Sequence, residues 1–302
     1  MTRYYSHGKL LLSGEYLILD GAVGLALPTI HGQDLVVEEN DSGLLHWESV
    51  NENEQTWFTA EFGFEDFELI RFTGEKQVGL QLQKILRNVR IMNSRFLIAS
   101  EGCKVRTALE FPRDWGLGSS STLINNIAKW ADRNPFQLLD KSFGGSGYDI
   151  ACANSEKPLF FRLEDGHPRA LQIDFDPPFK AHLHFVHLNQ KQSSRESIAA
   201  YEEVQDFSDQ TLDHISAIGK EMTRCASLKD FNMLVKEHER IIGKVLDQAP
   251  VQERMFRDFQ GQIKSLGAWG GDFILAASEI NPKDYFRKKG YKTVIPYKEL
   301  IL

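Results

Sequence analysis

Short apolar runs separated by polar turns fill about the first fifth of the chain, a pattern typical of strands in an antiparallel sheet. The runs cover residues 9–13, 15–19, 22–27, 35–39, 44–49 and 56–62. Asp20-Gly21 lies between two of them, and Asp-Gly in this setting is a strong hairpin signal, so we expect a tight hairpin there. The pattern then predicts a helix over 78–90 and strands over 95–99 and 104–111.

A glycine-serine loop follows and leads directly into a helix. The helix is predicted by an apolar stripe from Leu123 to Ala131, with Asn125, Asn126 and Lys129 off the stripe. Glycines let the loop backbone adopt positive φ and approach a ligand, and the unpaired amides of a first helical turn favour an anion. The loop therefore indicates a phosphate-binding site, although glycines before a helix also form plain turns and caps. Its residues are Gly116, Leu117, Gly118, Ser119, Ser120 and Ser121.

The rest of the chain mixes both periodicities. Strands are predicted over 159–163, 181–187 and 274–277, and helices over 193–204, 210–223, 228–247 and 251–264. A turn sequence begins at Asp165-Gly166, and we place a domain boundary there, which gives domains of residues 1–165 and 166–302. Strands followed by helices and a further strand predict an α+β second domain.

Charge and composition limit the classes of partner. The formal net charge of −7 argues against a nucleic-acid-binding surface, which needs concentrated positive charge. The sequence shows no signal-peptide pattern and no apolar run long enough to span a membrane, so we expect a cytoplasmic protein. Three scattered cysteines predict buried thiols rather than disulfides or a zinc site. A homodimer is common at this size, but no apolar stripe marks its interface.

Three glycine-bearing segments, in order, resemble the GHMP kinase superfamily, which includes galactokinase, homoserine kinase, mevalonate kinase and phosphomevalonate kinase. They are Gly8-Lys9 with Gly14-Glu15-Tyr16, the glycine-serine loop, and the turn from Gly267 to Asp272. The resemblance implies an α+β, two-domain fold. In it, an N-terminal mixed β/α nucleotide-binding domain precedes a C-terminal ferredoxin-like α/β sandwich, with the active site in the cleft between them.

Within the superfamily the chain is most similar to the mevalonate and phosphomevalonate kinases. Ser146-Gly147-Tyr148-Asp149 resembles the segment that carries their catalytic aspartate, so the resemblance implies Asp149 and Lys9 as catalytic residues. A carboxylate can accept the proton of an attacking hydroxyl, and a lysine can stabilise the transferred phosphoryl group. In an alternative, Lys9 alone lowers the pKa of the substrate hydroxyl, and Asp149 is the partner that orients Lys9.

The same resemblance implies the ligands. The loop from Gly116 to Ser121 would bind the phosphates of ATP, and Ser120 would be a ligand of Mg²⁺. The relatives have a glutamate eleven residues before the catalytic aspartate, where this chain has Leu138; Asp140 is the nearest acid. The implied substrate residues are Glu15, Tyr16, Ser146, Gly147, Lys191, Ser193, Ser194, Arg195, Gly270, Gly271 and Asp272.

The resemblance thus implies an ATP- and Mg²⁺-dependent kinase for a small molecule, mevalonate or its phosphate, in isoprenoid biosynthesis. Three alternatives stay open: a kinase for another alcohol such as a sugar or homoserine, a related decarboxylase, and a catalytically silent ligand-binding protein. Leu138 favours the silent protein, as does Trp269, which replaces a glycine and is either a packing aromatic or a ligand contact.

Overall fold

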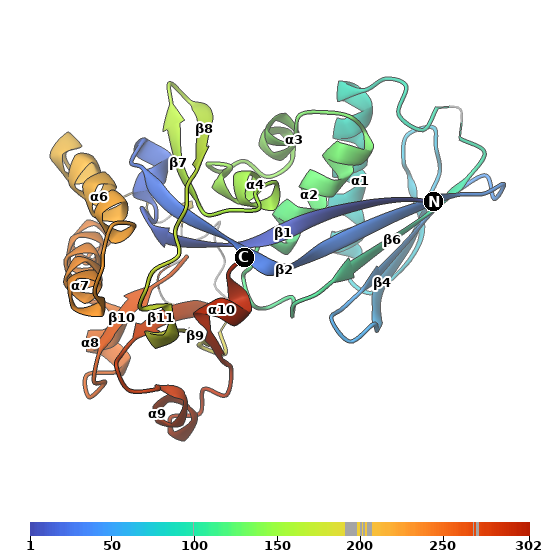
Figure 1. Cartoon of the computed structure of the whole chain (residues 1–302). Coiled ribbons are helices and arrows are strands. Elements are labelled where there is room, and N and C mark those ends of the chain that lie inside the picture. The colour runs from blue at the N-terminus through green and yellow to red at the C-terminus, as the bar shows by residue number, and fades with distance from the viewer. Residues whose placement is uncertain are drawn as a thin grey trace. The chain divides into compact units, whose positions relative to one another are not determined.

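A computed structural model describes residues 1–98, 100–190, 198–199, 201, 203, 207–267, 269 and 272–302. The chain forms two compact units of mixed strands and helices (Figure 1). The first unit comprises Met1–Gly8, His31–Arg113 and Gly118–Asn154, and the second comprises Lys9–Ile30, Asp114–Leu117 and Ser155–Leu302. The domain boundary that the sequence predicts between residues 165 and 166 stays a prediction.

The sheet of the first unit has the strand order β5-β4-β3-β6-β2. β3 and β6 are parallel, whereas the other neighbours along this path are antiparallel. β1 also pairs with β2, and both of these long strands contribute residues to both units. The strands are β1 (Thr2–Ser13), β2 (Gly24–Glu39), β3 (Leu45–Val50), β4 (Thr56–Phe62), β5 (Leu69–Thr73) and β6 (Cys103–Leu109).

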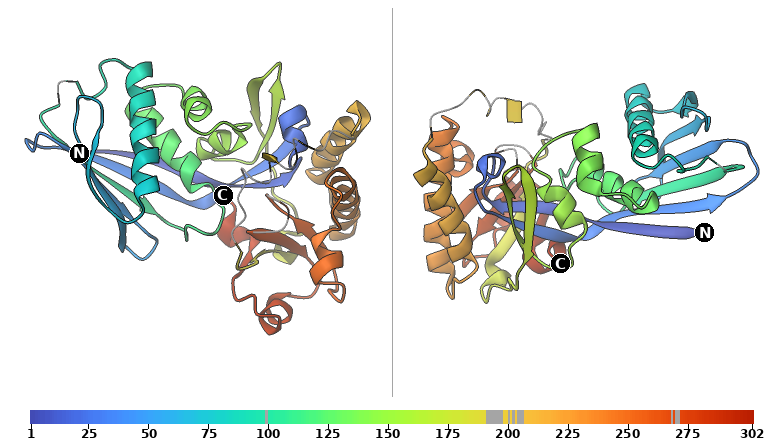
Figure 2. Two further views of the ribbon diagram at one scale, coloured as in Figure 1. Left: turned by 180° about the vertical axis from the view of Figure 1, so that it is seen from behind. Right: turned by 90° about the horizontal axis from the view of Figure 1, so that it is seen from above.

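Helices of the first unit cover one face of this sheet (Figure 2). They are α1 (Lys76–Met92), α2 (Ser119–Trp130), α3 (Pro135–Ser142) and α4 (Tyr148–Ala153). Apolar residues of α1 and α2 pack on alternate residues of β3 and β4, because successive strand residues point to opposite faces. α2 is more deeply buried than its apolar stripe predicts, since Asn125 and Asn126 are also fully buried.

The second unit contains the hairpin of β7 (Leu159–Glu164) and β8 (His167–Gln172), in which β7 pairs with the start of β2. It also contains an antiparallel four-stranded sheet in the order β10-β11-β9-β12. These strands are β9 (Leu183–His187), β10 (Gln262–Ser265), β11 (Phe273–Ala277) and β12 (Val294–Pro296). The helices are η1 (Leu17–Asp20), η2 (Lys180–His182), α6 (Asp209–Met222), α7 (Leu228–Val245), α8 (Val251–Met255), α9 (Lys283–Lys288) and α10 (Tyr297–Leu300).

The hairpin predicted at Asp20-Gly21 is wrong. Residues 17–20 form the 3-10 helix η1, and Gly21 ends it in the left-handed conformation, so β1 reaches β2 through a helical connection. The tight hairpin turn lies instead at Asp165-Gly166, where both residues have positive φ and join β7 to β8. The same dipeptide thus ends a helix in one place and forms a hairpin in the other.

The helix predicted over 251–264 is also wrong. α8 ends at Met255, and β10 begins at Gln262 and pairs with β11. The predicted strand over 95–99 is a turn as far as Ile98, in which Phe96 packs edge-on against Trp130. The helix predicted over 193–204 lies mostly outside the described residues.

Two expectations concern cysteines and membranes. Cys103 and Cys152 are buried free thiols, whereas Cys225 is partly exposed. Among the described residues, no helix has the length and apolar character needed to cross a bilayer.

Candidate active site

Asp149 occupies the first turn of α4, and Gly147 caps that helix with a φ of 86°. A side chain at Gly147 would be strained at this φ, and its Cβ would lie 3.0 Å from the ring of Phe136. The half-buried Asp149 carboxylate accepts a hydrogen bond from the Ser121 hydroxyl, and its other oxygen lies 3.1 Å from the amide of Ile150. Ser146, just before the cap, is buried. The predicted catalytic carboxylate is therefore held at both oxygens, and each oxygen keeps a lone pair for a further bond.

Ser121 is the last residue of the glycine-serine loop and belongs to the first turn of α2. Gly118 caps this helix in the left-handed conformation, Ser119 is half-buried and Ser120 is exposed. The Thr122 hydroxyl lies 2.7 Å from Oε1 of Gln33 and 3.2 Å from the Gly118 carbonyl, which ties the turn to β2. The structure thus brings Asp149 to the helix end at which the sequence predicts phosphate binding.

The beginning of the loop lies in the second unit beside two other predicted site residues. The Lys9 amide donates to the Leu117 carbonyl at 3.0 Å. Asp272 packs directly against Gly116, at the position that a Cβ would occupy, and Gly116 has a φ of 66°. Only glycine therefore fits at residue 116 without displacing Asp272. Parts of the first, second and third glycine segments meet here.

A fully buried charge cluster surrounds Glu15. Its carboxylate forms an ion pair with Lys264, whose ammonium also lies 3.3 Å from Glu239. Ser265 donates to Glu239 at 2.7 Å, and Nε2 of His238 lies 3.2 Å from Glu15. Burial raises the pKa of Glu15 to about 7 and also raises that of Glu239, although Lys264 opposes both changes. Burial lowers the pKa of His238 far below its usual range.

Burial favours the protonated form of both carboxylates in this cluster, whereas Lys264 favours the charged form. Two carboxylates face a single ammonium, and two buried negative charges in one site disfavour each other. The Gly14 amide donates to Nε2 of His238 at 3.1 Å, so this nitrogen of the neutral ring is an acceptor. Because Nε2 carries no proton, it donates no hydrogen bond to the Glu15 oxygen that lies 3.2 Å away.

Glu15 is therefore less accessible than a substrate residue needs to be. Its side chain has no exposed surface, so a direct substrate contact would require the cluster to open. The neighbouring Tyr16 is half-buried at a φ of 63°, with its ring 5.3 Å from that of Tyr201. Sequence reasoning missed Lys264 because it placed this residue at the end of a predicted helix, where a lysine is usually exposed, whereas the structure buries it in β10.

Comparison with solved structures identifies the fold. Mevalonate kinase from Methanococcus jannaschii superposes with a TM-score of 0.68 at 14% identity, over 95% of this chain and 94% of that one. Phosphomevalonate kinase from Streptococcus pneumoniae, in complex with phosphomevalonate and AMPPNP, gives 0.69 at 14% identity, over 96% and 95%. Galactokinase from Lactococcus lactis, complexed with galactose, gives 0.63 at 13% identity, over 95% and 87%.

This chain has the GHMP kinase fold. The expected α+β architecture is thereby confirmed, with the likeness extending over nearly the whole length of both chains. No protein-family model and no curated protein matches the sequence.

Leu138 stands where the family resemblance implies a glutamate for the metal site. Leu138, at the implied glutamate position, is fully buried in the core of the first unit, whereas Asp140 is exposed on the same helix. Within the described part of the chain, no group of three or more His, Cys, Asp or Glu residues could hold a metal ion. Near the first turn of α2, the described residues offer serine hydroxyls and the Asp149 carboxylate, so phosphate and water would have to supply the remaining ligands of Mg²⁺.

Trp269 is a packing residue. It is 1% exposed and lies against Gly243 of α7, which leaves no surface for a ligand. Several predicted substrate residues lie outside the described residues, namely Lys191, Ser193, Ser194, Arg195, Gly270 and Gly271.

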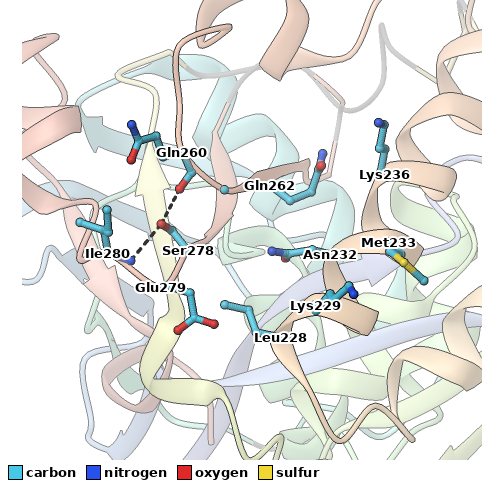
Figure 3. Close-up of a pocket in the computed structure, with 11 residues that line it drawn as sticks. Leu228, Lys229, Asn232, Met233, Lys236, Gln260, Gln262, Ser278, Glu279 and Ile280 are labelled. Carbon is cyan, nitrogen blue, oxygen red and sulfur yellow. Dashed lines mark hydrogen bonds between the residues drawn. The ribbon is translucent and has the colours of Figure 1, made fainter.

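An open groove of about 540 Å³ lies elsewhere in the second unit (Figure 3). Its walls are the first turns of α7, the residues before β10 and the residues after β11. None of the predicted site residues that the structure describes is among the residues lining this groove.

Proposed function

We propose that the protein is an ATP-dependent kinase that transfers the γ-phosphoryl group to a small molecule. The observation that carries this proposal is the bond between Ser121, in the first turn of α2, and the carboxylate of Asp149. This bond supports the proposal because a carboxylate, which can accept a proton, lies beside a helix end whose amides have no partners within the helix and favour an anion. Phosphoryl transfer needs both features, because it depends on positioning and on charge stabilisation.

Each group then has a defined task. The backbone of Gly116 to Ser121 binds the nucleotide phosphates, and Asp149 accepts the proton of the attacking hydroxyl. Lys9 stabilises charge on the transferred phosphoryl group, a role that rests on the sequence resemblance. When Mg²⁺ is bound with the nucleotide, it neutralises phosphate charge, and Ser120 is the residue of this chain that we assign to it.

The acceptor that we propose is mevalonate or its phosphate. Two observations support it: the sequence resemblance of the Gly-Glu-Tyr opening, and the likeness in fold to solved mevalonate and phosphomevalonate kinases. The likeness to galactokinase keeps a sugar as the second candidate acceptor. The core position of Leu138 favours a third candidate, a protein that binds nucleotide without turning it over.

The test is ADP release from ATP and Mg²⁺ with each acceptor offered separately: mevalonate, phosphomevalonate, galactose and homoserine. Turnover confined to mevalonate or phosphomevalonate supports the proposed acceptor. Turnover with a sugar keeps the kinase and replaces the acceptor. Nucleotide binding without ADP release for any acceptor contradicts the kinase proposal and favours the silent protein.

A further inference from the structure

A buried polar network joins α2 to α4 in the first unit. The side-chain amides of Asn125 and Asn154 bond reciprocally, at 3.0 Å and 2.7 Å. Asn125 also donates to the Ser6 hydroxyl at 2.8 Å, and that hydroxyl donates to Asn126 at 2.6 Å. Asn126 in turn donates to the Gln33 carbonyl at 2.8 Å.

This network is rigid because its members satisfy one another. Ser6, Asn125 and Asn126 have no exposed surface, and a buried polar group without a partner would be costly. Asn154 ends α4, so its amide pair with Asn125 fixes that short helix against α2. The carboxylate of Asp149 therefore projects from a helix that is itself held in place.

Ser121 lies on the same face of α2 as Asn125, one turn earlier. Its side chain is 6% exposed, and its hydroxyl points to Asp149. The sequence placed Ser121 among the nucleotide-binding residues, but a buried hydroxyl that donates to Asp149 has little freedom to reach a phosphate. The exposed Ser120 is the residue of this turn whose hydroxyl is open to a ligand.

We propose that Ser121 is a positioning residue for Asp149: its hydroxyl bonds one carboxylate oxygen while the Ile150 amide bonds the other, and the fixed carboxylate accepts the substrate proton at a remaining lone pair. This inference rests on the proposed kinase function. A carboxylate that rotates freely spends less time in the geometry for proton transfer, and small displacements of a reacting group reduce rates strongly. Loss of the Ser121 hydroxyl should change the KM for ATP little, because the hydroxyl acts through Asp149.

The test compares Ser121→Ala, Ser121→Thr and the control Ser49→Ala. Ser49 is also a buried serine of the first unit, and it accepts from Thr107 at 2.9 Å on the sheet. We expect Ser121→Ala to lower kcat by roughly 10- to 100-fold with the KM for ATP within about twofold, and Thr to restore most of the rate. Ser49→Ala should leave kcat unchanged. An unchanged kcat in Ser121→Ala, or a raised KM for ATP alone, would overturn the proposal.

A second measurement separates this proposal from the kinase proposal. If the wild-type protein turns over no acceptor, the kinase proposal fails, but thermal unfolding still reports on the bond. Ser121→Ala should then lower Tm in the wild-type background and have no further effect in the Asp149→Ala background, because the partner is already gone. Equal shifts of Tm in the two backgrounds would show that Ser121 does not act on Asp149.

Discussion

Lys264 forms a fully buried ion pair with Glu15, a residue 249 positions earlier in the chain. The pair ties the first glycine segment to β10, the strand that precedes the third segment. Burial takes both charges out of water, so removing one partner leaves the other uncompensated. Removing Lys264 leaves more unpaired buried charge than removing Glu15, because Glu239 also faces Lys264.

Lys264→Met should therefore destabilise the protein more than Glu15→Gln. The lysine variant leaves two buried carboxylates without an ammonium, which we expect to cost about 3–5 kcal/mol in the free energy of unfolding. The Glu15 variant keeps Lys264 paired with Glu239 and should lose clearly less. Urea unfolding measures both, with Lys157→Met as the control for an exposed pair, that of Lys157 with Asp174. A larger loss in Glu15→Gln would contradict this view of the cluster.

The Glu15 cluster also predicts how stability changes with pH. The pKa of Glu15 is raised from about 4.5 to about 7, so its contribution to stability is full below 4.5 and is lost as pH rises through 7. His238 has a lowered pKa and acts oppositely, because its contribution is lost as pH falls below its usual value of 6.5. Lys264 and Glu239 are the other charged members of the cluster.

We therefore expect Glu15→Gln to remove part of the decline in Tm between about pH 5 and pH 8. The measurement is a series of thermal unfolding curves for the wild type and the variant across that range. Parallel pH profiles for the two proteins would show that Glu15 does not take up a proton in the folded state.

Gly116→Ala tests the contact between the glycine-serine loop and Asp272. The variant adds strain at positive φ and a Cβ where Asp272 now lies, so loop and carboxylate must move apart. Gly43→Ala is the matched control, since Gly43 has a φ of 73° with open space around its Cβ position. Both variants should lose stability through strain at positive φ, Gly116→Ala the more because its Cβ also displaces Asp272, and only Gly116→Ala should raise the KM for ATP, by roughly tenfold. An equal KM for ATP in both would place the nucleotide away from Gly116.

The sequence predicted correctly the helices and strands whose apolar periodicity matches the face that each one packs against the core. The strand over Thr56–Phe62 and the long helices α1, α6 and α7 follow their apolar patterns closely. The apolar pattern gave a wrong prediction where residues with helical spacing lie partly in a strand that pairs with a neighbouring strand. Val251, Met255, Phe259 and Ile263 recur every four residues and all pack in one core, yet Ile263 does so from β10.

The site was predictable only in part, because side-chain partners far apart in sequence leave no local signal. The sequence predicted the loop from its glycines and serines, and the family resemblance implied Asp149, but nothing in the sequence shows that Ser121 faces Asp149. The buried states of Glu15 and Leu138 likewise depend on elements that only the folded chain brings together.

The most direct measurement is transfer of radiolabel from γ-labelled ATP to mevalonate or phosphomevalonate, with Asp149→Asn as the comparison. The proposed mechanism predicts labelled product from the wild type, and a rate in the variant below about a tenth of wild type with nucleotide affinity preserved. A variant that keeps more than a tenth of the rate would contradict Asp149 as the proton acceptor. A wild-type protein that binds ATP but labels no acceptor would contradict the kinase assignment itself.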